Sequence, residues 1–507
     1  VMRNQITPKR IAVVGAGICG LCTALGLSQL GHDITIYERD DDMPEGNPDD
    51  IFFDWLRRGA SQFKHPHAFL AVMSNLLSEQ FPDLIDEFWA AGARRVSFED
   101  MLPPDLSNSY RPAPEDESLW LMMCRRATME MVLRRYAERQ TNITFESGTR
   151  INAMVIDSNG RLPTITGLVT QQRSGTEPPI TISADIVVDA AGRGSPFKRW
   201  FHNHGLEIET ESHDAKIVYY TRHYQFKPGV EEPERDGKTR SAGDLGYLKY
   251  GVFPGAGGHF SVILCVPCED SILHDAVKDE TTFDTICQQI PGLVPWLGND
   301  KATPTTGTLG MGNIKAVWHN FMKADQPLLQ NYFAVGDAAV RTNPLYGRGC
   351  STGAIHSKIL TDVIAKWQDP ISAAQQFHEA TQTKLRPIWQ ASLNEDRTAI
   401  KRANLILNPE SDLNSRQKSL KSRLSRAYGD AITKASQQHI RVFRGAFRTF
   451  NLMEPPGYFL KDFKTQCLIF WTLLRDGSAN KNIRIVPGPS REDMIQAIAP
   501  PDQKAAA

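Results

Sequence analysis

The sequence GAGICG at residues 15–20 decides how the amino-terminal part of this chain folds. It follows an apolar run at 11–14, which predicts a buried strand, and it leads into a run at 18–30 that predicts a helix. Gly31 ends that helix, and the apolar residues 34–37 predict a second strand. Because short connections join the strands through a helix, we expect them to be parallel and adjacent.

The three glycines of this motif have separate roles. Gly15 permits the tight turn, Gly17 lets a pyrophosphate approach the backbone, and Gly20 lets the helix pack against the strand. Free N–H groups at the positive end of the helix then bind the anion. Glu38 ends the second strand, where a carboxylate accepts hydrogen bonds from both ribose hydroxyls. The pattern therefore predicts dinucleotide binding rather than a glycine-rich turn without function.

Composition limits the classes of function. The chain has 507 residues, of which 41% are hydrophobic and 23% charged, with a net charge of −1. These values are typical of a globular protein with about two to four domains, and the charge predicts neither nucleic acid nor an acidic membrane surface as a partner. The amino-terminal residues lack the apolar core of a signal peptide, and no run is long enough to span a bilayer. We therefore expect a cytoplasmic protein.

The eight cysteines include two pairs with CxxC spacing, Cys19 with Cys22 and Cys265 with Cys268. The pairs lie far apart in sequence and lack the tight turns of a zinc ribbon. Buried thiols in a reducing compartment are the expected state, rather than disulfides or a zinc site.

A second cofactor signal lies much further along the chain. The sequence NYFAVGDAA at 331–339 is followed by NPLYGRGCST at 343–352. A carboxylate after a buried strand can bind a ribityl hydroxyl, and a glycine-rich bend into a helix can direct N–H groups at a flavin carbonyl. Combined with the amino-terminal glycine motif, these runs indicate FAD rather than NAD.

At these positions the chain resembles the flavoprotein monooxygenases of the para-hydroxybenzoate hydroxylase fold group, and most closely their flavin epoxidase-like members. The resemblance also rests on RRGASQFKHPHAFL at 57–70, DAAGRGS at 189–195, Arg126 and NLMEPP at 451–456. The resemblance implies an α/β fold. In this fold, a Rossmann-type FAD-binding domain of the GR2 type is interwoven with a mostly antiparallel β-sheet substrate domain. A helical carboxy-terminal region follows them.

The order of the predicted elements divides the chain accordingly. Strands are predicted at 216–226, 247–253 and 260–266, the last two joined by a hairpin at 255–258. Residues 40–115 are expected to be irregular apart from a helix near 71–77. We expect a discontinuous FAD-binding domain (1–60, 120–205 and 330–370), a substrate domain (61–119 and 206–329) and a helical region (371–507).

The resemblance implies a set of site residues. The expected FAD-binding residues are Gly15, Gly17, Ile18, Cys19, Gly20, Glu38, Arg39, Arg57, Gln62, Arg126, Asp189, Gly192, Gly336, Asp337, Pro344, Gly347, Gly349, Cys350 and Ser351. His65, His67 and Arg126 are the candidates for a basic or hydrogen-bonding group beside the flavin. A metal is not expected at the two histidines, because no carboxylate partner accompanies them.

The leading hypothesis is an FAD-dependent monooxygenase. In the enzymes it resembles, a flavin C4a-(hydro)peroxide transfers one oxygen atom of O2, by hydroxylation or epoxidation, to an apolar, aromatic or olefinic small molecule. Ala191-Gly192 stands where NADPH-using relatives carry Asp-Gly, and no second GxGxxG occurs. Both NAD(P)H and a separate flavin reductase therefore stay open as electron donors. The alternatives are a reductase of the geranylgeranyl-reductase type, a flavin halogenase, whose W-x-W-x-I-P motif is absent, and a non-enzymatic flavin-bound scaffold.

Three further features are expected to be structural. Tyr220, Arg222 and Tyr224 share one face of a strand, where packing is favoured over lining a pocket. Residues 416–448 are rich in Lys and Arg, and residues 467–474 are apolar. A solvated helix face followed by a core helix is favoured here over an amphipathic membrane or partner surface.

Overall fold

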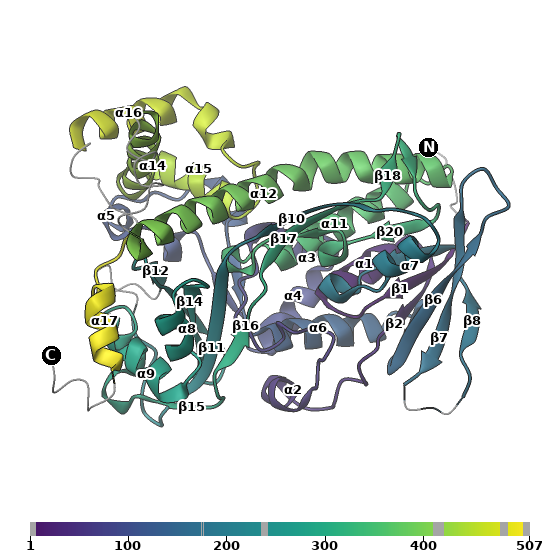
Figure 1. Cartoon of the computed structure of the whole chain (residues 1–507), viewed down its shortest axis with the longest axis horizontal. Helices are drawn as coiled ribbons and strands as arrows, with labels where there is room; N and C mark the ends of the chain where they lie inside the picture. Colours follow the sequence, from purple (N-terminus) through teal and green to yellow (C-terminus); the bar gives the residue numbers. More distant parts are fainter. Residues whose placement is uncertain are drawn as a thin grey trace.

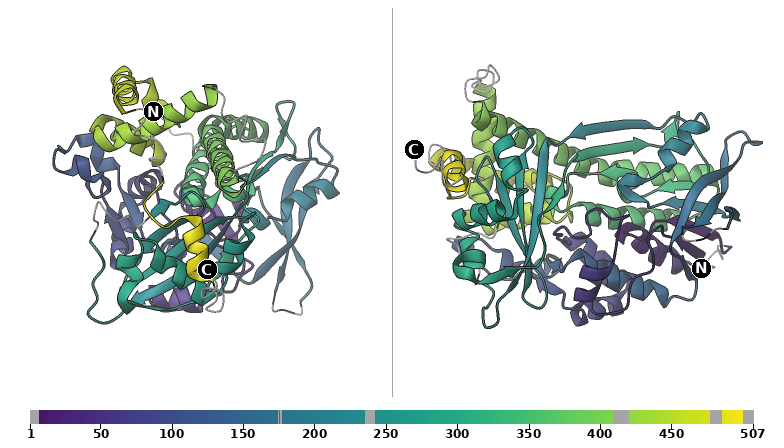
Figure 2. Two further views of the ribbon diagram at one scale, coloured as in Figure 1. Left: turned by 60° about the vertical axis from the view of Figure 1, so that its left-hand side comes forward. Right: turned by 60° about the horizontal axis from the view of Figure 1, so that its bottom comes forward.

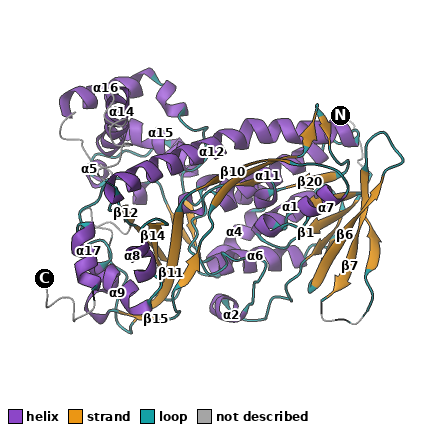
Figure 3. Ribbon diagram, viewed as in Figure 1, coloured by secondary structure: helices purple, strands orange, loops and turns teal. Residues whose placement is uncertain are grey.

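The structure is a computed structural model that describes residues 7–173, 175, 177–234, 242–408, 420–476 and 485–499. Its elements form three regions in Figure 1: a parallel sheet on the right, an antiparallel sheet on the left, and a lobe of carboxy-terminal helices at the upper left. Figure 3 shows the same view coloured by secondary structure, in which the long helix α12 (Pro370–Leu407) runs above both sheets.

The parallel sheet contains the predicted βαβ unit. Its strands, in spatial order, are β20 (Tyr332–Ala334), β9 (Ile186–Asp189), β1 (Arg10–Val14), β2 (Asp33–Tyr37) and β5 (Ile143–Glu146). Every pairing in it is parallel, and α1 (Ile18–Ser28) joins β1 to β2. Residues 11–14 are all buried, as expected for a strand that is covered on both faces. Helices α6 (Arg126–Glu138) and α11 (Gly349–Ile364) pack beside α1.

The turn after β1 requires two of its glycines for steric reasons. Gly15 has φ +107°, and a Cβ there would lie 2.5 Å from the carbonyl oxygen of Ala190. A Cβ on Gly20 would collide with the Gly15 carbonyl. The glycine motif therefore fixes how closely α1 approaches β1 and β9, as the sequence predicts.

The antiparallel sheet is also present. Its strands, in spatial order, are β12 (Ala242–Asp244), β13 (Lys249–Pro254), β14 (His259–Pro267), β11 (Ile217–Phe226) and β15 (Ala302–Pro304), with β16 (Leu309–Met311) paired to β11. The hairpin between β13 and β14, at 255–258, is confirmed. One face of the sheet packs on a core that includes Phe260, Leu264 and Phe283.

Two three-stranded sheets among the described residues were not predicted. The first is a meander of β6 (Thr149–Asp157), β7 (Thr164–Gln172) and β8 (Ile180–Ser183). The second consists of β10 (Glu209–Asp214), β17 (Lys315–Asn320) and β21 (Val340–Arg341). Their strands alternate partly buried and exposed positions, which gives a weaker apolar signal than the buried strands of the parallel sheet.

The expectation of irregular structure over 40–115 is wrong. Besides α3 (Ala71–Gln80), this region contains α2 (Pro48–Asp54) and α4 (Pro82–Ala90). Asn47 caps α2 by accepting hydrogen bonds from the N–H groups of Asp49 and Asp50, and both helices begin with proline. An amide cap followed by proline is a helix-start signal, which the abundance of Pro and Asp obscured.

Short elements complete the fold. They are β3 (Arg94–Val96), β4 (Leu121–Met123), α5 (Pro104–Ser107), α7 (Phe197–Asn203), α8 (Ser271–Ala276), α9 (Glu280–Gln289), α10 (Val294–Leu297), β18 (Met322–Lys323) and β19 (Gln326–Pro327).

The carboxy-terminal region is helical, as predicted. After α12 come α14 (Leu420–Gln438), α15 (Ile440–Phe450), α16 (Phe463–Asp476) and α17 (Arg491–Ile498). The left view of Figure 2 shows α14, α15 and α16 as a lobe at the upper edge of the molecule. Residues 467–474 are helical as predicted, within α16, but their assignment to the core is wrong because Trp471 and Leu474 are exposed. In the basic run, the side chains of Arg416, Lys418 and Lys421 lie outside the described residues.

All eight cysteines are free thiols. Cys22 and Cys265 are buried, but Cys268 is exposed, so the expectation of buried thiols fails for that member of the pair. Within the described ranges, no helix has the length and apolar content needed to cross a membrane.

Candidate functional site

A cavity of about 950 Å³ lies where the carboxyl ends of β1, β2 and β9 face the antiparallel sheet. It is lined by residues from both glycine motifs, from the 57–68 segment and from β11, β13 and β14. Its volume is near the upper end of the range for ligand pockets in proteins. The fold therefore brings the two predicted cofactor signals to one site.

The amino terminus of α1 forms one end of this site. Gly17 is the residue before the helix, with φ −77°, and the nearest atom to the position of a Cβ there is Nη2 of Arg126, at 4.0 Å. The space between a positive helix end and a guanidinium suits a pyrophosphate. Unlike Gly15 and Gly20, Gly17 leaves room for a ligand rather than for another part of the chain.

A second helix end opens on the same cavity. Gly349 is the first residue of α11, and no atom lies within 4 Å of the position a Cβ would take there. Helices α1 and α11 are held together by buried contacts, including a 2.7 Å hydrogen bond between the hydroxyls of Thr23 and Ser357. The two helix ends are therefore in fixed positions on one cavity, which fits a long dinucleotide with an anionic and a carbonyl-bearing end.

Glu38 lies at the end of β2 within a buried ionic network. Its Oε2 accepts a hydrogen bond of 2.9 Å from the Ala16 N–H and lies 3.1 Å from Nη1 of Arg57. Arg57 also pairs with Asp40 and Glu130, both at 3.1 Å. Burial alone would raise the pKa of Glu38, but Arg57 and the backbone donors hold that pKa below its usual value. Glu38 is thus an ionised acceptor beside the glycine motif.

His67 and Arg126 form a second pair beside the cavity, in which Arg126 is buried and His67 is partly buried. Nδ1 of His67 donates to the carbonyl of His65 at 2.8 Å, so its Nε2 accepts a hydrogen bond from Nη1 of Arg126 at 3.2 Å. Burial, and then the charge of Arg126, lower the pKa of His67 to about 3. The pKa of His65, whose Nδ1 lies 2.9 Å from Oγ1 of Thr221, falls to about 4 because it is buried. Both imidazoles are therefore neutral near pH 7, and His67 can position Arg126.

Asp337 follows β20 and lines the cavity. Burial raises the pKa of its carboxyl group, against the opposing effect of Arg341 and Arg126. The preceding residue, Gly336, has φ +60°, and its N–H donates to Nδ1 of His356 at 3.2 Å. His356 therefore fixes the backbone immediately before Asp337.

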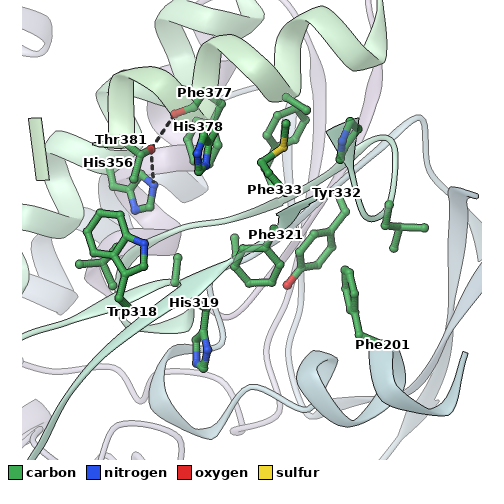
Figure 4. Close-up of a pocket in the computed structure, with 17 residues that line it drawn as sticks. Phe201, Trp318, His319, Phe321, Tyr332, Phe333, His356, Phe377, His378 and Thr381 are labelled. Carbon is green, nitrogen blue, oxygen red and sulfur yellow. Dashed lines mark hydrogen bonds between the residues drawn. The ribbon is translucent and has the colours of Figure 1, made fainter. Parts of the chain in front are cut away.

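Figure 4 shows His356 beside a smaller cavity of about 50 Å³, lined mainly by aromatic residues of β17, β20 and α12. Nε2 of His356 donates to Thr381, whose hydroxyl donates in turn to the carbonyl of Phe377. The ring also stacks on Phe377, with centroids 4.9 Å apart. This cavity has room for one or two water molecules and not for an organic cofactor.

The loop after Asp337 is held by a residue from the carboxy-terminal region. Nδ2 of Asn343 donates to Asp396 at 2.7 Å, and the hydroxyl of Tyr346 donates to the same carboxyl group at 2.9 Å. Oδ1 of Asn343 accepts from the hydroxyl of Tyr219 on β11. Pro344 and the following residues are thereby fixed between the antiparallel sheet and α12.

Most of the predicted site residues line the large cavity. Those that do are Gly15, Gly17, Ile18, Cys19, Glu38, Arg39, Arg57, Gln62, His65, His67, Arg126, Gly192, Gly336, Asp337, Pro344, Gly347, Gly349 and Cys350. Three do not line it. Gly20 packs against Gly15, Asp189 accepts hydrogen bonds from Ser195 and Tyr332, and Ser351 accepts one from the N–H of Leu70.

The residues on the sheet side of the cavity were missed by sequence reasoning. They are mainly apolar or aromatic: Tyr219, Lys249, Tyr250, Phe253, Ile263, Cys265 and Met311 from the sheet, with Phe450 from α15. The alternation of side chains along β11 shows that Tyr220, Arg222 and Tyr224 share one face of the strand. It does not show which face of the strand lines the cavity. These three residues pack toward α8 and α9, where Arg222 and Tyr224 both bind Asp284. Tyr219, on the opposite face, lines the cavity.

The donor set of the site suits FAD and does not suit a metal ion. Two open helix ends, an ionised carboxylate after β2 and a second carboxyl after β20 match the phosphate, ribose and ribityl groups of that cofactor. In the described part of the chain, no three His, Cys, Asp or Glu side chains are arranged to hold a metal ion.

Comparison with known proteins agrees with this assignment. A family model described as FAD dependent oxidoreductase matches residues 10–48, which span β1, α1 and β2. Protein Rv3254 of Mycobacterium tuberculosis is 23% identical over 421 residues, which are 75% of this chain and 79% of that protein.

Two solved structures share the fold. The flavin-dependent brominase Bmp2 aligns with a TM-score of 0.60 and 13% identity, covering 92% of this chain and 98% of its own. PqsL, a probable FAD-dependent monooxygenase from Pseudomonas aeruginosa, aligns with a TM-score of 0.55 and 14% identity, covering 78% of this chain and 97% of its own. The predicted para-hydroxybenzoate hydroxylase fold is confirmed, and fold and amino-terminal match together define an FAD-dependent oxidoreductase.

Proposed function

We propose that this protein is an FAD-dependent monooxygenase that inserts one oxygen atom from O2 into an apolar aromatic or olefinic small molecule. The observation that carries the proposal is the single cavity that extends from the two open helix ends to the apolar face of β11, β13 and β14. Bound FAD supplies the redox chemistry and the activation of O2. The apolar sheet side supplies a water-poor place for a substrate beside it.

In this proposal the residues of the chain bind and orient the cofactor and the substrate, and they do not themselves react. Glu38, Arg126 and the end of α1 hold the adenosine and pyrophosphate groups, and Asp337 holds the ribityl chain. The N–H groups at the start of α11 stabilise negative charge on the flavin ring. His65, His67 and Arg126 stay our candidates for the group that tunes the reaction. With both histidines neutral near pH 7, Arg126 is the only charged member of that set.

Oxygenation is proposed in preference to halogenation, although the shared fold includes a brominase. The sequence lacks the W-x-W-x-I-P motif. The test is turnover of candidate olefins and phenols with reduced FAD under ¹⁸O2 in the presence of bromide and chloride. We expect one ¹⁸O atom in the product. A halogenated product, or a saturated product without label, would show that the halogenase or the reductase alternative is correct.

We also propose that electrons reach the flavin from a separate reductase. The support is the single GxGxxG and the Ala191-Gly192 pair in place of Asp-Gly. We expect the flavin absorbance near 450 nm to persist on anaerobic addition of NADH or NADPH to the FAD-loaded protein. It should disappear when a flavin reductase supplies the electrons. Rapid bleaching by either nicotinamide alone would contradict this proposal and leave the oxygenase assignment intact.

A further inference from the structure

Helix α16 presents its apolar side chains to the exterior. Phe463 is 76% exposed, Phe470 is 56% exposed, and Trp471 and Leu474 are 60% and 68% exposed. Large apolar side chains that are exposed singly are common, but a contiguous group marks an interaction site.

These residues form one stripe along the helix. At 3.6 residues per turn, positions 463, 467, 470, 471 and 474 fall on one face, and we call Phe463, Cys467, Phe470, Trp471 and Leu474 the α16 stripe. The opposite face packs against the lobe, where Thr465, Ile469 and Thr472 are buried and Leu468 and Leu473 are partly buried. Three aromatic rings nevertheless face outward, which is unusual for a helix on a globular protein.

The lobe that carries the stripe is strongly basic. Residues 420–476 contain ten Lys and Arg and four Asp and Glu, a net charge of +6, whereas the whole chain has −1. Lys464 and Arg475 are exposed on the same helix and flank the stripe on the side of Trp471. Figure 1 shows α16 at the outer edge of this lobe, at the upper left.

We propose that the α16 stripe docks this protein on the surface of an anionic lipid bilayer. Aromatic and leucine side chains bordered by Lys and Arg suit a helix that lies in the headgroup region without crossing the membrane. A symmetric contact between the stripes of two copies does not suit this surface equally well, because it would bring two lobes of +6 together. The bilayer offers both an apolar boundary and a negative charge.

The test is co-sedimentation of the FAD-loaded protein with vesicles. One set of vesicles contains phosphatidylcholine with phosphatidylglycerol, and the other contains phosphatidylcholine alone. We compare the wild type with the double variant F470S/W471S and with I272S, since Ile272 on α8 is also 51% exposed but lies outside the stripe. We expect binding to the anionic vesicles, weakened about tenfold or more in the double variant and unchanged in I272S. Added salt should weaken the binding of all three proteins to the anionic vesicles.

Three results would overturn the proposal. The first is a wild-type protein that fails to sediment with anionic vesicles, and the second is equal binding by the wild type and by F470S/W471S. The third is self-association of the wild type without lipid that the double variant abolishes, which would make the stripe a contact between copies. Unchanged far-UV circular dichroism and flavin absorbance in the variants establish that each comparison concerns folded protein.

Discussion

A Gly17→Val variant is expected to purify without bound FAD and to unfold at the same temperature as FAD-free wild-type protein. The valine side chain occupies the space between the start of α1 and Arg126, where we propose that the pyrophosphate binds. The backbone tolerates it, because Gly17 has φ −77° and no protein atom is nearer than 4.0 Å. We expect FAD affinity to fall by about a hundredfold or more, measured by titration of flavin fluorescence.

Two other glycines make the comparison specific. Gly160→Val places the same side chain at a site outside the cavity where the nearest atom is 3.5 Å away, so its FAD affinity should match the wild type. Gly15→Ala should fail differently, by loss of folded protein, because of its φ of +107° and the contact with Ala190. Tight FAD binding by Gly17→Val would show that the pyrophosphate does not lie at the end of α1.

Arg57→Met is expected to destabilise the fold by about 3–5 kcal/mol, the cost of removing one partner from a buried ionic network. The side chain of Arg57 is 2% exposed, and its guanidinium faces Glu38, Asp40 and Glu130. Methionine has a similar length and leaves these carboxylates without their shared cation. The measurement is urea unfolding of FAD-free protein followed by circular dichroism. Arg94→Met removes an ion pair that is about 40% exposed on both sides and should cost less than about 1 kcal/mol.

The defect of Arg57→Met should shrink as the pH falls. In the wild type the pKa of Glu38 is lowered, so its ionised form contributes stability above the unfolded pKa, and that contribution is lost on acidification. The variant lacks the contribution at every pH. The two unfolding free energies should therefore converge as the pH falls below about 5, past the unfolded pKa of about 4.3 and through the lower pKa of folded Glu38. A difference that stays constant over this range would assign the defect to packing rather than to charge.

The sequence predicts best where the signal is local. The βαβ unit, the hairpin at 255–258 and the glycine-rich bend into a helix at 343–352 all occur as predicted. Each depends on a glycine or on an uninterrupted apolar run. The meander of β6, β7 and β8 was missed because its strands are half exposed. The Lys- and Arg-rich run at 416–448 was recognised, but the net charge of −1 gave no sign that the lobe as a whole is basic.

The motif residues that line the cavity could be predicted from the sequence, and the residues on its sheet side could not. Gly17, Glu38, Asp337 and Gly349 belong to motifs whose spacing reflects the shape of one cofactor. The sheet side of the cavity depends on which face of β11 turns toward the 57–68 segment, and that follows from tertiary packing. The sequence around Asp396 does not indicate that this residue anchors the site, because its partners Asn343 and Tyr346 lie some fifty residues earlier in the chain.

The contact between Asp396 and the 343–346 loop has a consequence for biosynthesis. A ribosome translates the first glycine motif long before it reaches α12, but the 343–346 loop lacks its anchor until residue 396 has left the exit tunnel. The N–H of Ala71 likewise awaits Asn451 as its acceptor. We therefore expect the nascent polypeptide to complete its cofactor site only after residue 451 has been made.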